Sequence, residues 1–187
     1  MDIHYAAGRA VAAVVVLGLP GLEPLAQATA SVPLSYPYVP GLLSFREGPA
    51  AIAAIARLTE PPDVLVFDGQ GLAHPRRFGI ASHLGVLLDL PSIGCAKTRL
   101  IGRYSEPGPK RGSFSYLRDR GRIIGAALRT RERVAPVFVS VGHRVSLKDS
   151  LQIVLGCCAG FRLPETTRCA DRLARAAAGM TADGRVK

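Results

Sequence analysis

Residues 64–69 read Val64-Leu65-Val66-Phe67-Asp68-Gly69, an apolar run that ends at a carboxylate and a glycine. A short, uninterrupted apolar run followed by a turn is typical of a central strand that is covered on both faces. In open α/β sheets, ligands bind beyond the ends of such strands, which is where Asp68 is expected to lie. Asp-Gly is also a common turn pair, so the dipeptide by itself favours a turn over a functional carboxylate.

Strands and helices alternate on either side of this run. Apolar and β-branched segments predict further strands over 1–5, 9–17, 22–34, 92–96 and 136–140, with hairpin-like segments from 114 onward. Helices are predicted over about 45–60 and 78–88, from a Ser146 cap to about 156, and after Pro164. In the first helix, Ser44 and Glu47 have the spacing of a capping box. The alternation predicts an α/β fold in one domain over 1–187, with a frayed end over about 180–187.

The composition excludes several classes of protein. Of the 187 residues, 48% are hydrophobic and 20% charged, which excludes a disordered or low-complexity chain. No apolar run reaches the ~18 residues of a membrane-spanning helix, so no membrane partner is expected. Four cysteines without a C-x-x-C pair argue against zinc and a disulfide framework, and favour a reducing, cytoplasmic setting. Lys and Arg number 24 against 14 Asp and Glu, and this net charge of +10 suggests a polyanionic partner.

Carboxylates are the best candidates for chemistry. Asp2, Glu47 and Asp68 each lie near the end of a separate predicted element, and together they could hold Mg²⁺, which takes hard oxygen ligands. Lys97, after the strand over 92–96, could offset charge on a phosphate. Taken singly, each of these residues has an ordinary structural explanation. Competing chemistry has less support: no H-x-x-x-H pair, P-loop or G-x-S-x-G stretch is present, and nothing indicates a lowered pKa for Cys95.

Several motifs in order resemble the signatures of endonuclease V, the deoxyinosine 3′-endonuclease family, and span about residues 2–175. The matching stretches are Pro37 to Glu47 (PYVPGLLSFRE), Phe67 to Gly71 (FDGQG), His74 to His83 (HPRRFGIASH), Gly94 to Lys97 (GCAK), Val139 to Arg144 (VSVGHR) and Arg162 to Glu165 (RLPE). The resemblance implies an RNase H-like fold with a central mixed β-sheet flanked by helices. It also implies a Mg²⁺-dependent endodeoxyribonuclease of DNA repair, with Mn²⁺ able to substitute for the metal.

The resemblance implies a substrate and a product. The family cuts the second phosphodiester bond 3′ to a deaminated base, leaving 3′-hydroxyl and 5′-phosphate ends. The expected partner is double- or single-stranded DNA that contains deoxyinosine, or RNA that contains inosine, and the protein is expected to be a monomer.

The motif matches also imply residue roles. Asp2, Glu47 and Asp68 would bind the metal, Asp171 would lie close to it, and Lys97 would lie near the scissile phosphate. The loop Pro37-Tyr38-Val39-Pro40 would be a wedge that enters the duplex, and prolines on both sides of Tyr38 stiffen it. The residues implied in the lesion pocket are Gly41, Leu43, Gly69, Gly79 and Ile80, with His74 as a further DNA contact. Extrusion of a base costs a few kcal/mol, and less for a mispaired one.

The start of the chain departs from the family pattern. The family has a few dozen residues before the first carboxylate, whereas Asp2 here follows only Met1, and we expect the strand that carries Asp2 to be poorly paired. One alternative is therefore a truncated, catalytically inactive domain that binds inosine-containing nucleic acid. A second is a secreted protein, because 10–19 followed by Ala28-Thr29-Ala30 imitates a signal peptide, although cleavage there would remove Asp2.

Overall fold

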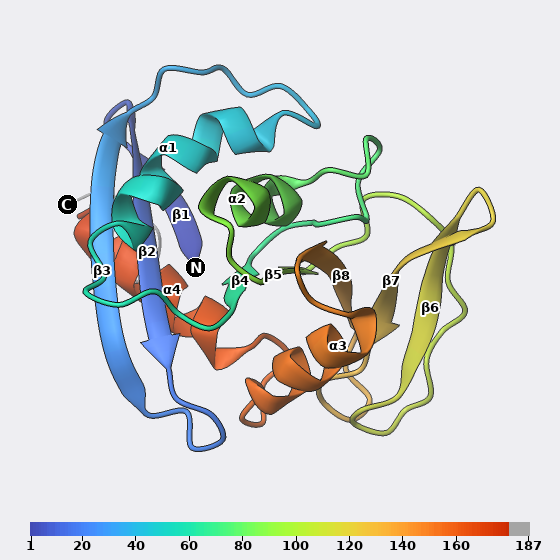
Figure 1. Ribbon diagram of the computed structural model, residues 1–187. Coiled ribbons are helices and arrows are strands. Elements are labelled where there is room, and N and C mark those ends of the chain that lie inside the picture. Colours follow the sequence, from blue (N-terminus) through green and yellow to red (C-terminus); the bar gives the residue numbers. More distant parts are fainter. Residues whose placement is uncertain (180–187) are drawn as a thin grey trace. The chain divides into compact units, whose positions relative to one another are not determined.

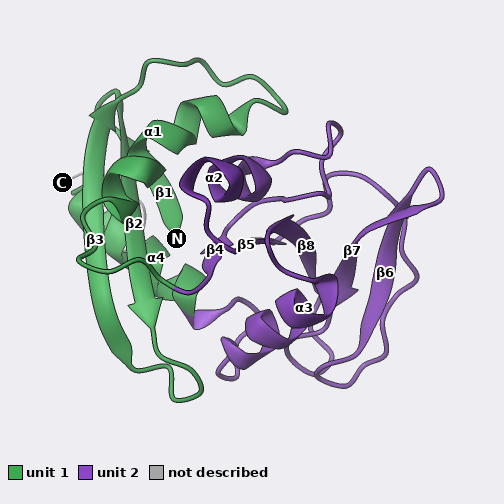
Figure 2. Ribbon diagram, viewed as in Figure 1, with its two compact units in different colours: residues 1–62, 166–187 green, residues 63–165 purple. Residues whose placement is uncertain are grey.

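The chain divides into two compact units, coloured separately in Figure 2. One unit comprises residues 1–62 and 166–187, and the other comprises residues 63–165. The computed structural model describes residues 1–179, so the predicted frayed end over about 180–187 lies outside the described residues. No helix within residues 1–179 is long and apolar enough to cross a membrane.

The first unit is built on a three-stranded antiparallel sheet (Figure 1). Its strands are β1 (Asp2–Ala6), β2 (Arg9–Leu17) and β3 (Pro24–Pro33), in that order. β1 pairs with β2 along its whole length, from Asp2 opposite Ala13 to Ala6 opposite Arg9, so the expectation of poor pairing is wrong on this side. The turn between them has positive φ at Ala7 (47°) and Gly8 (71°), as a tight two-residue hairpin requires.

Two helices cover opposite faces of this sheet. They are α1 (Leu43–Ile55), which packs on β2 and β3, and α4 (Glu165–Ala177). In β1, His4 is hydrogen-bonded to Asp171 of α4, whereas the next residue, Tyr5, is hydrogen-bonded to Glu47 of α1. Successive side chains of a strand point to opposite faces, so α1 and α4 lie on different sides of β1.

The capping box predicted for Ser44 and Glu47 is wrong. The residue before the first helical turn is Leu42, and no side chain caps this end. A turn fixes the start of the helix instead, because Gly41 has a φ of 79° and the Leu42 amide donates to the carbonyl of Val39. Glu47 is thereby left inside the helix, where its side chain contacts Tyr5.

The second unit contains a five-stranded mixed sheet in the order β4-β5-β8-β7-β6. Its strands are β4 (Leu65–Phe67), β5 (Ser92–Ala96), β6 (Phe114–Asp119), β7 (Arg122–Leu128) and β8 (Val137–His143). β4 and β5 are parallel, and the other pairs are antiparallel. The apolar run before Asp68 thus forms β4, with all three of its residues buried, as predicted.

Helices pack against this sheet and complete its core. α2 (Ile80–Leu88) packs on β4, β5 and β8, and α3 (Leu147–Gly156) packs on β7 and β8. Leu151 and Val154 of α3 share a core cluster with residues such as Ile93 and Val139. Ser146 caps α3 as predicted, because its hydroxyl accepts a hydrogen bond from the Asp149 amide.

The loop after β4 lies directly against the sheet, and this contact leads to a stability prediction. The Gly71 amide donates to the Ser140 hydroxyl, and a Cβ at Gly71 would lie 2.0 Å from the Val141 carbonyl oxygen. We expect Gly71→Ala to destabilise the protein by about 2–3 kcal/mol, since backbone must move apart to admit the methyl group. Urea unfolding measures this loss as a lower transition midpoint.

Gly160→Ala is the matched control. Gly160 has a φ of 78°, but a Cβ there would meet no atom within 4 Å. Only the backbone penalty of about 1 kcal/mol is expected. Equal losses in the two variants would contradict the argument from close packing.

Candidate functional site

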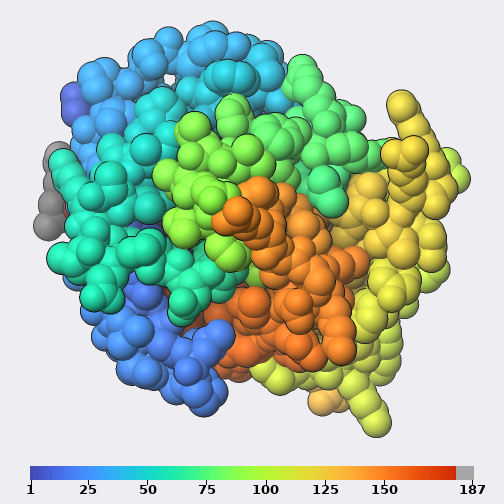
Figure 3. Space-filling model, in the orientation of Figure 1, coloured from blue at the N-terminus to red at the C-terminus, as the bar shows by residue number. Residues whose placement is uncertain are grey.

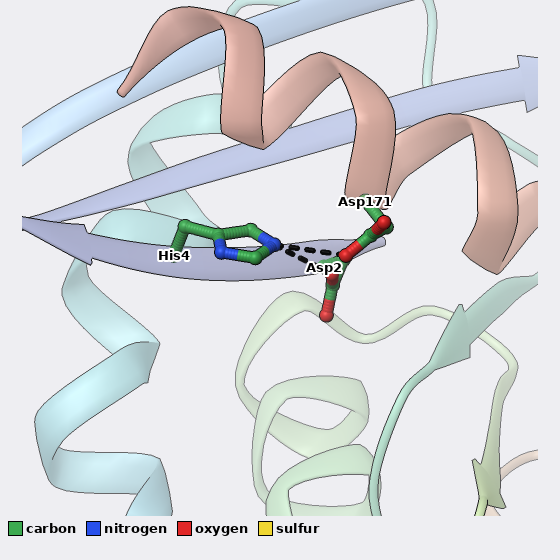
Figure 4. A group of neighbouring side chains, drawn as sticks. All are labelled: Asp2, His4 and Asp171. Atoms are coloured by element: carbon green, nitrogen blue, oxygen red, sulfur yellow. Dashed lines mark hydrogen bonds and ion pairs between the residues drawn. The ribbon is translucent and has the colours of Figure 1, made fainter. Parts of the chain in front are cut away.

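A cluster of two carboxylates and an imidazole joins β1 to α4 in the first unit. The His4 Nε2 atom lies 2.9 Å from Asp171 Oδ1 and 3.5 Å from Asp2 Oδ2 (Figure 4). One ligand atom from each of the three side chains lies within 4.8 Å of the others. All three are partly buried, so a cation between them would be partly shielded from water. This donor set suits a divalent cation, with the carboxylates favouring Mg²⁺ or Mn²⁺ and the imidazole adding affinity for Mn²⁺.

Asp171 is held in its charged form. Burial raises its pKa, but hydrogen bonds from His4 and Arg175 and the Arg175 charge outweigh that effect, so the pKa lies below its ordinary value. Arg175 lies one turn further along α4, with its Nε atom 3.2 Å from Asp171 Oδ1. The carboxylate therefore stays available as an anionic ligand at neutral pH.

His4 is not among the site residues predicted from the sequence. A signal was present, since side chains two apart in a strand share a face, and Asp2-Ile3-His4 therefore places an imidazole beside the candidate carboxylate. The contact with Asp171 spans 167 positions, and no local pattern predicts a contact at that separation.

Glu47 belongs to a different contact. The Tyr5 hydroxyl donates to Glu47 Oε1 at 2.6 Å, and the Arg46 guanidinium lies 4.5 Å from the centre of the Tyr5 ring. Burial and then the Glu47 carboxylate raise the pKa of Tyr5, so the phenol remains a donor. The cluster of Asp2, His4 and Asp171 does not include Glu47, and its role as a metal ligand stays a prediction.

In the second unit, Asp68 and Lys97 follow neighbouring parallel strands. Phe67 is paired with Gly94, and Asp68 comes directly after β4 as Lys97 comes directly after β5. Their side chains form an ion pair with Lys97 Nζ 2.5 Å from Asp68 Oδ2. The Asp68 side chain is 15% exposed and that of Lys97 45%, so the ammonium is the more accessible to a phosphate. The carboxyl edge of parallel strands is where ligands bind in this kind of sheet.

Arg162 fixes the backbone at Lys97. Its guanidinium donates to the carbonyl oxygens of Lys97, Ala135 and Pro136, which ties the end of β5 to the start of β8. Two of the motif stretches, 94–97 and 162–165, are thus joined in space by one side chain. This bracing limits the movement of the backbone that carries the candidate phosphate ligand.

The Pro-rich loop of the first unit exposes an aromatic side chain. Tyr38 is 69% exposed, whereas Tyr36, two residues earlier, packs its ring against Phe45. Arg46 donates to the Tyr36 carbonyl and anchors the base of the loop to α1. An exposed ring on an anchored, Pro-flanked loop suits insertion into a base stack. The wedge role remains a prediction.

Gly69, Gly79 and Ile80 lie together in the second unit. A Cβ at Gly69 would lie 2.7 Å from the Ile80 Cγ2 atom, and a Cβ at Gly79 would clash with the Gln70 carbonyl oxygen. These contacts give both glycines a packing reason of their own. Gly41 and Leu43 belong to the first unit, and the lesion pocket that the resemblance implies stays a prediction.

His74, predicted as a further DNA contact, is buried. It is 6% exposed, and its Nδ1 atom accepts a hydrogen bond from the Arg76 amide. Burial, and then the Arg76 charge, lower its pKa, so the ring is neutral at physiological pH. His74 therefore shapes the loop before α2, and its contact with DNA is untested.

Thiol chemistry has little support. Cys95, Cys157 and Cys158 are buried, and burial raises the pKa of each thiol, to about 12 for Cys158. A nucleophilic cysteine needs the opposite shift, toward the thiolate. The phosphodiester chemistry expected from the carboxylates is therefore the better-supported reading.

Known proteins confirm what the motifs indicated. The family model of endonuclease V matches residues 1–172. The chain belongs to the endonuclease V family. It is 56% identical over 174 residues to endonuclease V of Roseiflexus sp. (strain RS-1), covering 93% of this chain and 78% of that relative. As a member of the family, it is a nuclease, and endonuclease V enzymes are metal-dependent.

Solved endonuclease V structures share the fold. The enzyme from Streptomyces avermitilis superposes with a TM-score of 0.91 at 50% identity, covering 94% of this chain and 78% of that one. Endonuclease V of Ciona intestinalis, in complex with a 24mer DNA containing an inosine followed by a ribo-adenosine, has a TM-score of 0.82 at 31% identity, covering 94% and 83%. The predicted RNase H-like α/β fold, a mixed sheet flanked by helices, is confirmed.

Proposed function

We propose that this chain is a Mg²⁺-dependent DNA repair endonuclease that recognises deoxyinosine and hydrolyses the second phosphodiester bond 3′ to it. The products would carry 3′-hydroxyl and 5′-phosphate ends. The observation that carries the proposal is the Asp68–Lys97 pair at the carboxyl edge of β4 and β5, in a chain whose family includes a relative solved with inosine-containing DNA.

Carboxylates provide the proposed metal ligands. Asp2, Glu47 and Asp68 are assigned by their motif positions, and Asp171 and His4 by their contacts with Asp2. Mg²⁺ bound there would polarise the phosphodiester and lower the pKa of an attacking water. The Tyr5 hydroxyl has a positioning role, since its hydrogen bond fixes one oxygen of Glu47.

Lys97 is the proposed ligand for the scissile phosphate. Its ammonium is compact and positively charged, so it can stabilise the negative charge that develops on the phosphate oxygens during cleavage. Asp68 orients this ammonium through the ion pair, and Arg162 holds its backbone. Lys97 would therefore contact the substrate while Asp68 faces the metal.

Recognition of the lesion is assigned to the wedge and the pocket. Tyr38, between Pro37 and Pro40, would occupy the space of the extruded base, and Gly41, Leu43, Gly69, Gly79 and Ile80 would receive that base. The proposed setting is the cytoplasm and the proposed state a monomer. Inosine in RNA is a second substrate of the same pocket.

Tyr38→Ala is expected to slow cleavage of a duplex substrate more than cleavage of a single-stranded substrate. We expect cleavage of inosine in a duplex to fall about tenfold, because the lost ring no longer replaces the stacking of the extruded base. Cleavage of inosine in a single strand should change much less, since there is no opposing stack to fill. Tyr38→Phe, which keeps the ring, is the control. Equal losses on both substrates would argue against a wedge.

The proposed function is tested by nicking of an end-labelled duplex that carries one deoxyinosine, in Mg²⁺ and in EDTA. We expect a nick one nucleotide beyond the lesion in Mg²⁺ only, and none in the same duplex with deoxyguanosine. Binding without a nick would instead identify an inactive inosine-binding domain. Neither binding nor nicking by folded protein would refute the proposal.

A further inference from the structure

The edge strand of the second unit carries a row of aromatic and basic side chains. Along β6, Phe114, Tyr116 and Arg118 are exposed, while Leu117 between them is buried. The two rings are each 46% exposed and meet edge to face at 5.5 Å. The Arg118 guanidinium lies 5.6 Å from the centre of the Tyr116 ring. The yellow atoms of this hairpin lie at the molecular surface in Figure 3.

Positive charge surrounds this row. Arg118, Arg120 and Arg122 are all exposed within nine residues of hairpin, and the single acidic residue there is Asp119. Asp119 already forms an ion pair with Arg77 at 2.5 Å, so it offsets little of the arginine charge. Phe114, Tyr116 and Arg118 share one face of β6, which is called the hairpin face below, whereas Arg122 is paired with Asp119 and points to the other face.

We propose that the hairpin face binds a single-stranded segment of DNA that flanks the lesion. Unpaired bases offer free π-faces that stack on exposed aromatic rings, whereas the bases of a duplex do not. Arginines beside the rings match the phosphates that accompany each base. A second copy of the chain is a poorer occupant, because two such faces would bring like charges together. The proposal rests on the proposed function, and it adds a second contact with the same substrate.

The hairpin is joined to the loop that leads into the predicted lesion pocket. Arg77, the partner of Asp119, lies two residues before Gly79, and it also donates to the carbonyl of His74. The ion pair therefore connects the end of β6 with the loop before α2. Because side chains alternate along a strand, Asp119 lies on the face of β6 opposite to Arg118, so this ion pair holds the hairpin from the side opposite to the hairpin face.

The test uses fluorescence anisotropy of the full chain with a labelled 20-nucleotide single strand that lacks inosine. We expect the double variant Phe114→Ser, Tyr116→Ser to bind about tenfold more weakly. Arg118→Glu should also weaken binding and reduce its dependence on salt. Lys148→Glu, the same change of charge at an exposed position of α3, is the control and should bind as wild type. Circular dichroism verifies that each variant is folded.

Cleavage separates this inference from the proposed function. Nicking of a fully duplex deoxyinosine substrate should survive in Arg118→Glu, while the advantage of a substrate with a single-stranded flank is lost. If wild type nicks the duplex but Arg118→Glu and the double variant bind the single strand as tightly as Lys148→Glu, the inference is wrong. Sedimentation that shows a wild-type dimer broken by the double variant would also overturn it, in favour of self-association.

Discussion

Replacing Asp68 with Asn is expected to lower the rate of nicking at deoxyinosine by about 10²–10³-fold, the usual cost of removing one charged group from a reaction centre. Asp68 directly follows β4, is largely buried and lies 2.5 Å from the Lys97 ammonium. An amide of the same shape removes the charge that would bind the metal and orient Lys97. The initial rate of nicking in saturating Mg²⁺ measures this loss.

Asp63→Asn is a control on the same segment. Asp63 precedes β4 and lies near the opposite end of the strand, so loss of its charge should leave nicking near the wild-type rate. Affinity of Asp68→Asn for the deoxyinosine duplex in EDTA should remain close to wild type, which separates catalysis from binding. A folded Asp68→Asn protein that nicks at the rate of Asp63→Asn would remove Asp68 from the mechanism.

Asp2→Asn is expected to reduce nicking about 100-fold and to raise the Mg²⁺ concentration needed for half-maximal rate. Asp2 provides one of the two carboxylates that converge with His4, and the amide that replaces it is a poor ligand for a hard cation. A titration of rate against Mg²⁺ concentration distinguishes this effect from a loss of fold. Mn²⁺ binding by calorimetry provides a readout that does not depend on activity.

Two further variants sharpen this prediction. Glu60→Gln removes the same charge from an exposed position after α1 and should leave the Mg²⁺ dependence unchanged. His4→Ala should weaken Mn²⁺ more than Mg²⁺, because imidazole nitrogen suits the softer ion. If Asp2→Asn shows the Mg²⁺ dependence of Glu60→Gln, then Asp2 does not bind the catalytic metal.

Local signals predicted most of the secondary structure. The strand over 92–96 and the Ser146 cap were predicted because their causes lie within a few residues, in an apolar run and in a hydroxyl before a helix. The start of α1 was mispredicted for the opposite reason. Its position depends on the turn at Gly41 and on the contact of Glu47 with Tyr5, which overrule the spacing of Ser44 and Glu47.

The candidate site was predictable only through the resemblance. Nothing near Asp171 in the sequence indicates that it meets His4, and nothing near Glu47 indicates Tyr5, since both contacts join distant segments. The positions of Asp68 and Lys97 at strand ends were predicted from the residues alone, whereas their ion pair was not, because it depends on β4 and β5 being adjacent and parallel. The sequence does not show whether the glycines of the predicted pocket are needed for base binding or for packing, and the close approach of Gly69 to Ile80 illustrates the second reason.

The two-residue turn at Ala7 and Gly8 controls more than the path of the backbone. It determines which β1 side chains face α4 and which face α1, because the length of the turn fixes the register of β1 against β2. A slip of one residue would exchange the two sets, sending Asp2 and His4 toward α1 and Tyr5 toward α4. Insertion or deletion of a residue in this turn would thus turn Asp2 and His4 away from Asp171, although none of the three candidate ligands is itself replaced. The identity of the ligands and the strand register that positions them are therefore determined by different parts of the sequence.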